Sequence, residues 1–304
     1  MTPPIPFGAR SSADEVIAGI DLTRHNIVVT DCDSTIGFRT MTALAANGAH
    51  VIGMARSFPI ASAACKAAGY RCSPVACDFT DFDSVSSAVD AMERAAEPLD
   101  AIVTSSGVRM FQAGTTRYGI EMHFLAQYLT PFALVTRLSG LLRGGSGRIV
   151  IASDDTASKS APAGGVMFDN LDGRRFYDAK VFFAQAQLAC ALFARELARR
   201  MTLRGVSVNT YREGNSVAET AAEARNRQWR LRLIASLKAL VHRTILGNAG
   251  TPTLLAANPQ VAGHTGLHWH GCQIQANELV ADSNIAGKLW EVSDQLIARL
   301  SGVK

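Results

Sequence analysis

FYDAKVFFAQAQLACALFARELARRM, residues 176–201, is the stretch that decides the fold. Its apolar side chains recur at the three- and four-residue spacing of an α-helix, as at Leu188 and Leu192. Alanines occupy many of the remaining positions, and alanine both favours the helix and lets it approach a neighbouring layer closely. The stretch therefore predicts a long helix packed against a β-sheet.

Short apolar runs on either side of this helix predict the strands of that sheet. They alternate with segments of helical periodicity, an order typical of a parallel, doubly wound sheet. The predicted strands are residues 26–30, 50–54, 72–77, 99–104, 147–153, 206–210 and 266–272, and the predicted helices, besides 176–201, are 35–47, 59–68, 81–96, 118–142 and 281–300. The predicted fold class is α/β, a Rossmann-type doubly wound parallel sheet in a single domain.

Three local features refine this outline. Residues 1–22 form a proline-rich leader and a short helix, in which Ser12 and Glu15 have the spacing of a capping box. The Rossmann-type domain then occupies residues 23–304, and Pro131 predicts a kink or break inside the helix at 118–142. Residues 221–243 alternate basic and apolar side chains, which predicts a basic amphipathic helix.

Composition excludes several classes of protein. Hydrophobic residues make up 48% of the chain and charged residues 18%, which indicates a globular protein with a large core. The net charge of +4 is too small to indicate a nucleic-acid partner, and no uncharged apolar run reaches the roughly 18 residues of a membrane span.

The six cysteines are scattered, which favours reduced thiols and a cytoplasmic location. His268, His270 and Cys272 alternate without a fourth ligand, so no metal site is predicted.

Seven segments, in order along the chain, carry a family resemblance. They are FGARSSADEVIAGIDL (7–22), LAANGAHVIGMARS (44–57), CDFTDFDSV (77–85), LFARELARR (192–200), GVSVNTYREG (205–214), TLLAANPQVAGHTG (253–266) and KLWEVSDQL (288–296). Together they resemble the short-chain dehydrogenase/reductase family, in its retinol dehydrogenase-like branch. The resemblance implies a Rossmann-type fold, a nicotinamide cofactor and a lid over the substrate at about 212–250. It also implies a homo-oligomer assembled through the helices at 118–142 and 176–201.

The phosphate loop of the chain departs from the family pattern. The family's TGxxxGxG reads TDCDSTIG at residues 30–37, and only Gly37 keeps its glycine. The Asp31 carboxylate stands where a diphosphate would approach, and like charges about 4–5 Å apart repel by several kcal/mol at an effective dielectric constant near 20. Glu213 replaces the proline of the family's Pro-Gly turn and adds a second carboxylate near the nicotinamide position. We therefore predict that the protein uses no cofactor.

Other cofactor features persist, and they leave an NADP-dependent oxidoreductase as the alternative. By the resemblance, Arg56 stands where an arginine meets the adenosine 2′-phosphate, and Asp78 where an aspartate approaches adenine. Gly107 ends the sequence TSSG (104–107) in place of the family's NNAG.

The family's catalytic residues, Asn, Ser, Tyr and Lys, are all replaced. Alignment by resemblance puts Gln127, Asp154, Phe183 and Gln187 at these four positions. A phenylalanine has no proton to give to a carbonyl oxygen and a glutamine has no charge, so ordinary carbonyl reduction is not expected. We predict a repurposed non-redox enzyme that performs a cyclisation, dehydration or isomerisation, as in natural-product biosynthesis. Asp154 would be its acid or base, and the two amides would orient the substrate.

The predicted substrate is an apolar small molecule. Phe182 and Phe183 supply an apolar pocket edge, and Tyr177 lies one turn before them. Arg109 is a candidate partner for an anionic group of the substrate, and Trp229 of the lid is a candidate apolar contact. A non-catalytic protein that binds a ligand or serves as a partner subunit is a further alternative.

Overall fold

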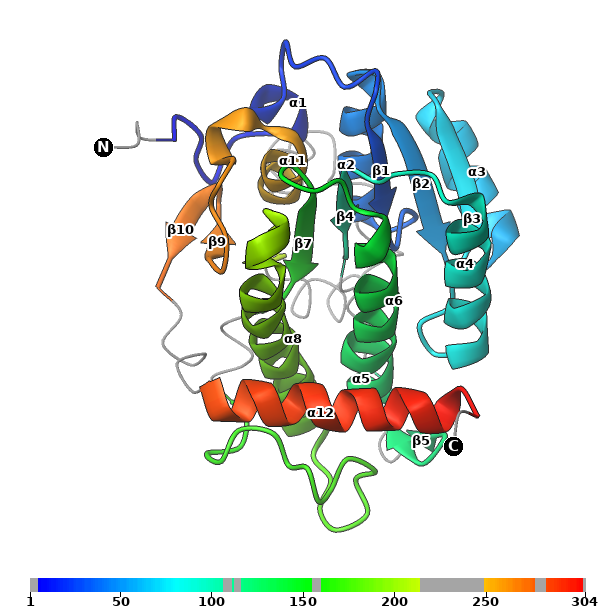
Figure 1. Ribbon diagram of the computed structural model, residues 1–304, viewed down its shortest axis with the longest axis vertical. Coiled ribbons are helices and arrows are strands. Elements are labelled where there is room, and N and C mark those ends of the chain that lie inside the picture. Colours follow the sequence, from blue (N-terminus) through cyan, green and yellow to red (C-terminus); the bar gives the residue numbers. More distant parts are fainter. Residues whose placement is uncertain are drawn as a thin grey trace, which may run out of the picture.

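A computed structural model describes residues 5–105, 111, 116–154, 160–213, 249–276 and 283–302. Its main element is an eight-stranded sheet in the order β10-β9-β8-β7-β4-β1-β2-β3 (Figure 1). The strands are β1 (Asn26–Val29), β2 (His50–Ala55), β3 (Cys72–Ala76), β4 (Ala101–Val103), β7 (Arg148–Ala152), β8 (Ser207–Tyr211), β9 (His268–His270) and β10 (Gln273–Gln275). All pairings are parallel except that of β10 with β9. The predicted doubly wound α/β fold is confirmed.

The strand order contains one switch point, between β1 and β4. The chain runs from β1 outward to β2 and β3, then crosses to the other side of β1 to form β4, β7 and β8. Ile27 of β1 consequently pairs with Val51 of β2 on one side and with Ala101 of β4 on the other. In open sheets of this type, ligands bind beside the carboxyl ends of the strands at the switch point.

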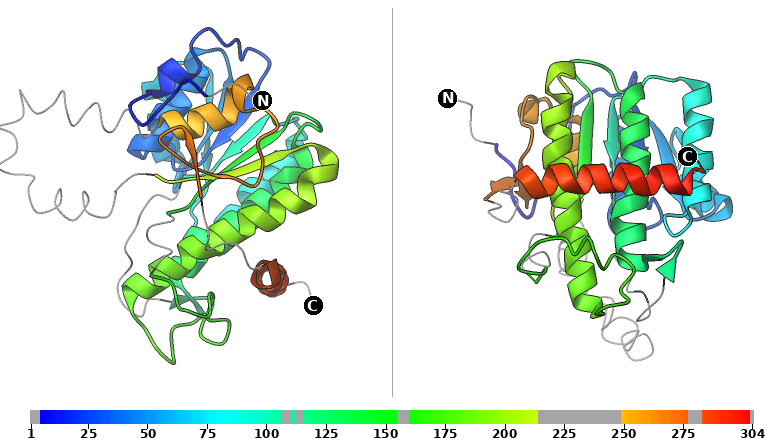
Figure 2. Two further views of the ribbon diagram at one scale, coloured as in Figure 1. Left: turned by 90° about the vertical axis from the view of Figure 1, so that its left-hand side faces the viewer. Right: turned by 60° about the horizontal axis from the view of Figure 1, so that its bottom comes forward.

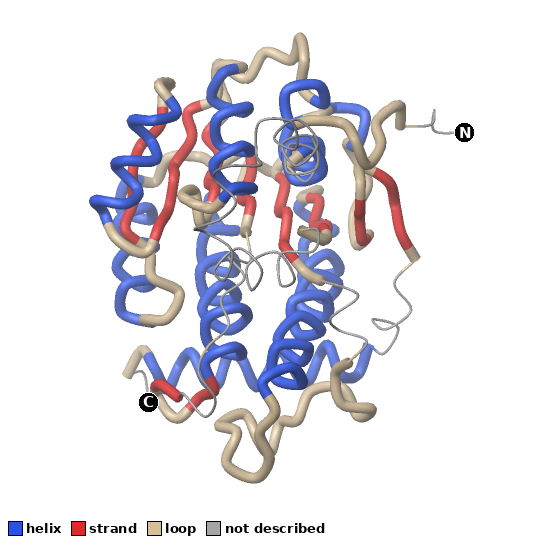
Figure 3. Tube along the Cα trace, turned by 180° about the vertical axis from the view of Figure 1, so that it is seen from behind, coloured by secondary structure: helices blue, strands red, loops and turns tan. Residues whose placement is uncertain are grey.

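Helices cover both faces of the sheet, as Figures 1 and 3 show from opposite sides. One face packs on a core that contains buried residues of α1 (Ala13–Val16), α2 (Thr35–Ala46), α3 (Phe58–Ala68) and α11 (Gly250–Ala257). The other packs on a core from α4 (Phe82–Ala95), α5 (Met122–Phe124), α6 (Thr130–Leu138), α8 (Ala179–Met201) and α12 (Ser283–Leu300). Helix α11 was not among the predicted elements. The predicted lid helix at 221–243 lies outside the described residues.

The organising helix is α8, and its first residues explain where it starts. The Asp178 carboxylate caps it by accepting from the backbone N–H groups of Lys180 and Val181. Tyr177 therefore lies just before the helix and Lys180 in its first turn. By length and composition the stretch Ala179–Arg204 could cross a bilayer, but 89% of its apolar window is buried inside the protein. The helix belongs to the core.

The predicted helix at 118–142 is interrupted. A two-stranded ribbon of β5 (Thr116–Arg117) and β6 (Ile120–Glu121) comes first, and a π-helical turn, Leu125–Leu129, separates α5 from α6. Pro131 has no N–H with which to bond the Gln127 carbonyl four residues earlier. The Cys190 thiol of α8 donates to that carbonyl instead, at 3.1 Å. The predicted break is confirmed, and it lies one turn before the proline.

The C-terminal part departs further from the prediction. The strand expected over 266–272 ends at His270, and the chain turns at Cys272, which has a φ of +60°, to form β10. Helix α12 then crosses α6 and α8 (Figure 2). Trp290 packs 5.0 Å from the Phe132 ring and lies under the Arg200 guanidinium, at 3.9 Å. The face that the family resemblance assigned to oligomerisation is thus covered by a helix of the same chain.

We expect Leu289→Ala to lower the free energy of unfolding by about 3 kcal/mol, because Leu289 is fully buried between α12 and the helices beneath it. Urea unfolding followed by circular dichroism measures this change. Glu291→Ala, on the exposed side of the same helix, is the control and should change stability by less than about 0.5 kcal/mol. Equal effects of the two substitutions would mean that α12 does not pack as described.

Candidate active site

The site lies along the carboxyl ends of β1, β4, β7 and β8. Thr30 follows β1, Ser105 follows β4, Asp154 follows β7 and Glu213 follows β8, each within two residues of its strand. The backbone N–H of Ser105 donates to Thr30 Oγ1 at 3.0 Å, which joins the two strands at the switch point. These residues stand where a doubly wound sheet binds its ligand.

The turn between β1 and α2 keeps a tight geometry although it has lost glycines. Asp31 has a φ of +46°, in the left-handed region that glycine favours and that aspartate tolerates better than most residues. Ser34 caps α2 by accepting from the Gly37 N–H at 3.0 Å. A Cβ added to Gly37 would lie 2.2 Å from the Asp31 carbonyl oxygen, so this contact requires glycine. The turn therefore keeps a position that only glycine fits, directly before the first turn of α2 ends.

Negative charge surrounds this turn. Burial, followed by the charges of Cys65, Asp33 and Asp31, raises the pKa of the Cys32 thiol to about 12. Burial and the Asp31 charge also raise the pKa of Cys77, at the end of β3. Asp31 thus differs from the glycine of the family pattern by its charge. Its backbone has a φ that glycine also adopts.

The adenosine side of the crevice has two candidate residues. Arg56 is exposed directly after β2, and Asp78 lies two residues past β3. The Asp78 carboxylate accepts from both the backbone N–H and the hydroxyl of Thr80, so it organises its own turn. Gly107, the third predicted position on this path, lies outside the described residues.

Three of the four residues that the alignment placed at the catalytic positions are joined by hydrogen bonds. The Gln187 side chain donates to Gln127 Oε1 at 3.1 Å and accepts from the backbone N–H of Asp154 at 2.8 Å. The Ser153 hydroxyl donates to the Gln187 carbonyl oxygen at 3.0 Å. Both glutamines are buried and Asp154 is half-buried. The two amides therefore fix the loop that carries the Asp154 carboxyl group.

One polar pair in this region was missed by the sequence reasoning. His123 Nδ1 lies 2.6 Å from Glu121 Oε1, and both side chains are almost fully buried. Glu121 also caps α5 through its other oxygen, which accepts from the N–H groups of His123 and Phe124. The His123 ring meets Phe183 edge to face at 6.2 Å. An acidic residue two positions before a histidine at a helix start is the signal that could have revealed the pair.

The predicted substrate residues are distributed unevenly. Phe183 is buried beside His123, and Phe182 is fully buried with its ring stacked on Tyr177 at 5.1 Å. Phe182 is therefore part of the core in this structure. Arg109 and Trp229 lie outside the described residues.

Glu213 is buried, unlike an ordinary loop carboxylate. Its Oε1 accepts from the Ser105 hydroxyl at 2.5 Å and from the Tyr211 hydroxyl at 2.8 Å, and its side chain is only 8% exposed. The Tyr211 hydroxyl oxygen also lies 3.2 Å from the Thr104 carbonyl oxygen, a longer contact than the one with Glu213. Burial, and next the Glu213 charge, raise the pKa of Tyr211 well above its usual 10.

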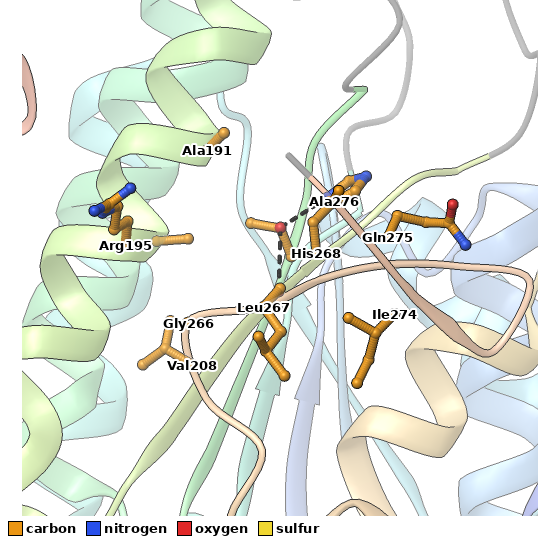
Figure 4. Close-up of a pocket in the computed structure, with 11 residues that line it drawn as sticks. Ala191, Arg195, Val208, Gly266, Leu267, His268, Ile274, Gln275 and Ala276 are labelled. Carbon is orange, nitrogen blue, oxygen red and sulfur yellow. Dashed lines mark hydrogen bonds between the residues drawn. The ribbon is translucent and has the colours of Figure 1, made fainter. Parts of the chain in front are cut away.

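A pocket of about 470 Å³ lies between α8 and the β9–β10 hairpin (Figure 4). Its polar lining includes Arg195, Gln275 and Thr210, whose hydroxyl lies 2.9 Å from His268 Nδ1. Its lining contains none of the predicted site residues, so it is separate from the Gln127–Gln187 pair. Within the described ranges no group of three or more His, Cys, Asp or Glu side chains is arranged to hold a metal ion.

The strand order defines a doubly wound α/β protein. A family model described as short chain dehydrogenase matches residues 25–166. The WW domain-containing oxidoreductase of Drosophila melanogaster is 26% identical over 97% of this chain and 73% of its own length. Human retinol dehydrogenase 14 is 29% identical over 73% of this chain and 66% of its own length. The chain is thus similar to short-chain dehydrogenases and related oxidoreductases over most of its length.

Solved structures share the fold. An uncharacterized protein of Mycobacterium paratuberculosis superposes with a TM-score of 0.72 at 20% identity, covering 94% of this chain and 97% of that one. An NADPH-bound short chain oxidoreductase of Pseudomonas aeruginosa PAO1, described as containing an atypical catalytic center, has a TM-score of 0.61 at 23% identity. That alignment covers 83% of this chain and 96% of the other.

Two predictions from sequence are contradicted by these comparisons. The non-redox enzyme was wrong, because the matched relatives are named oxidoreductases and dehydrogenases. The absence of a cofactor was wrong as well, because structures that share the fold contain NADPH. The physical reason lies in the turn at Asp31, where a lost glycine had been taken as a lost phosphate cradle. Asp31 adopts the left-handed backbone conformation that a glycine at this position could adopt.

Proposed function

We propose that the protein is an NADP-dependent oxidoreductase with an atypical catalytic centre. The observation that carries the proposal is the β1–α2 turn, whose backbone still requires glycine at position 37 and still presents a helix N-terminus to the crevice. The names of the relatives support the same activity. A bound nicotinamide would supply or accept the hydride. A residue of the chain must donate or accept the proton that accompanies it.

Four residues are proposed to hold the cofactor: Gly37, Arg56, Asp78 and Gly107. Gly37 keeps the turn open to phosphate, and Asp78 shapes the turn beside the adenosine half. Arg56 is exposed at the end of β2, on the adenosine side, where a guanidinium can bind a 2′-phosphate in bidentate fashion. This arrangement favours NADP over NAD.

Asp154 is proposed to exchange the proton with the substrate oxygen, because Phe183 has no ionisable group. The backbone N–H of Asp154 donates to Gln187, which fixes this residue at the carboxyl end of β7. The Gln127 and Gln187 amides then give the pocket a neutral polar wall beside Phe183. An apolar alcohol or carbonyl compound is the substrate class that suits a pocket with both amide and phenylalanine side chains.

Assembly and location belong to the proposal too. Because α12 covers the α6 and α8 face, a homo-oligomer would have to form through another surface. The six cysteines are all free thiols, which supports a reducing compartment such as the cytoplasm.

Titration with NADPH, followed by isothermal calorimetry, tests the proposal. We expect a dissociation constant in the micromolar range, and we expect Arg56→Ala to weaken NADPH binding roughly tenfold while NADH binding changes little. Lys66→Ala, a substitution of an exposed cation on α3, is the control and should leave both cofactors unaffected. Absence of any binding by the wild-type protein would refute the proposed function.

A further inference from the structure

Glu213 is a buried carboxylate that the proposed mechanism does not use. Two hydroxyl groups, from Ser105 and Tyr211, converge on the same oxygen, Oε1. Both donors come from the carboxyl ends of strands, Ser105 after β4 and Tyr211 at the end of β8. Such charge-assisted hydrogen bonds stabilise a carboxylate and hold it in one position. The two hydroxyl groups therefore hold the Glu213 carboxyl group in one position beside the ends of β4 and β8.

The position of this charge along the crevice follows from the strand order. A dinucleotide that crosses the switch point places its adenosine half beside β2 and its diphosphate at the β1–α2 turn. Its other half, which carries the nicotinamide, must then extend over the ends of β4, β7 and β8. Glu213 follows β8 and contacts Ser105 after β4, so it spans this half of the crevice.

We propose that Glu213 makes the site prefer the oxidised cofactor over the reduced one. The nicotinamide ring carries a positive charge when oxidised and none when reduced, so a nearby carboxylate attracts only the oxidised ring. Burial of Glu213 limits screening by solvent and strengthens that attraction. This inference rests on the proposed NADP-dependent function, and it makes bound NADPH a stronger hydride donor than free NADPH.

Asp31 adds to the same field. It lies in the β1–α2 turn, and its charge is the smallest of the causes that raise the pKa of Tyr211. A cofactor that carries one more positive charge is favoured by both carboxylates. The two departures from the family pattern thereby act in one direction, toward the oxidised form.

Calorimetric titration of the full chain with NADP⁺ and with NADPH, separately, tests the inference. The wild-type protein should bind NADP⁺ more tightly than NADPH. E213Q should weaken NADP⁺ binding about tenfold and change NADPH binding much less, because it removes the charge and keeps the shape. A tenfold change in the ratio of the two constants corresponds to about 30 mV in the two-electron potential of the bound couple.

Two controls separate charge from structure. Tyr211→Phe removes one hydroxyl donor and keeps the carboxylate, so the preference for NADP⁺ should persist. Glu291→Gln removes one exposed charge on α12 and should leave both constants unchanged. If neither cofactor binds the wild-type protein, the proposed function fails. If both bind and E213Q keeps the wild-type ratio, only the role of Glu213 fails. A wild-type protein that binds NADPH more tightly overturns the inference without any variant.

Discussion

Replacing Gly37 with alanine is expected to weaken NADPH binding about a hundredfold and to destabilise the fold by about 3 kcal/mol. The added Cβ would lie 2.2 Å from the Asp31 carbonyl oxygen and 2.9 Å from its carbonyl carbon. Both are backbone atoms, so the turn itself must move, and forced displacements of this kind cost on the order of 3 kcal/mol. The same energy, lost from a turn that must hold phosphate, corresponds to about a hundredfold in affinity.

Gly287→Ala is the matched control for this substitution. Gly287 lies inside α12, and a Cβ there would meet nothing within 4 Å, so alanine should stabilise the helix by about 0.5–1 kcal/mol. Thermal unfolding and calorimetric titration of the two variants provide the comparison. A Gly37→Ala protein with wild-type affinity would show that the turn does not take part in cofactor binding.

The sequence predicted the fold well because periodicity reports local structure directly. The pattern at Leu188 and Leu192 produced α8, and the short apolar runs produced the parallel strands of the sheet. Pro131 predicted a break in its helix, because a missing N–H acts within one turn of the chain. At that break the Cys190 thiol of another helix donates to the Gln127 carbonyl oxygen, and no local pattern contains that contact.

Long-range packing accounts for most of what was missed in the fold. Strand β10 pairs with β9 because the chain turns back at Cys272, which has a positive φ. Cysteine normally prefers a negative φ, so its presence in the sequence did not indicate a turn. The position of α12 depends on contacts of Trp290 with Phe132 and Arg200, which are distant in sequence. Periodicity predicted the helix at 281–300 and could not say which face of the molecule it covers.

For the site, the sequence predicted which residues lie near one another better than it predicted their conformations and partners. Alignment by resemblance brought Gln127, Asp154 and Gln187 to one place, and the structure joins them by hydrogen bonds. Identity alone was misleading at Asp31, because an aspartate adopted the left-handed conformation of the glycine it replaces. At Glu213 the residue type was readable from the sequence, but the groups around it were not. The two hydroxyl partners, which decide what that charge can do, come from separate strands.

Asp154→Asn is expected to lower kcat by about 10²- to 10³-fold, the usual contribution of a positioned acid or base. The loop should keep its place, because the backbone N–H of Asp154, and not its side chain, makes the bond to Gln187. NADPH affinity and the unfolding midpoint should therefore match the wild-type protein. Steady-state reduction of apolar carbonyl compounds, with NADPH oxidation followed by absorbance, measures the effect.

Asp169→Asn is the charge-matched control, since Asp169 is 67% exposed and pairs only with Arg175 among the ion pairs described. It should leave kcat within about twofold, as surface substitutions usually leave folding and site geometry intact. Asp154→Glu keeps a carboxyl group and should recover part of the lost turnover. If Asp154→Asn retains wild-type kcat, the proton must come from another group of the pocket. The buried His123–Glu121 pair beside Phe183 would then be the next group to test, because it is the ionisable pair that contacts the former tyrosine position.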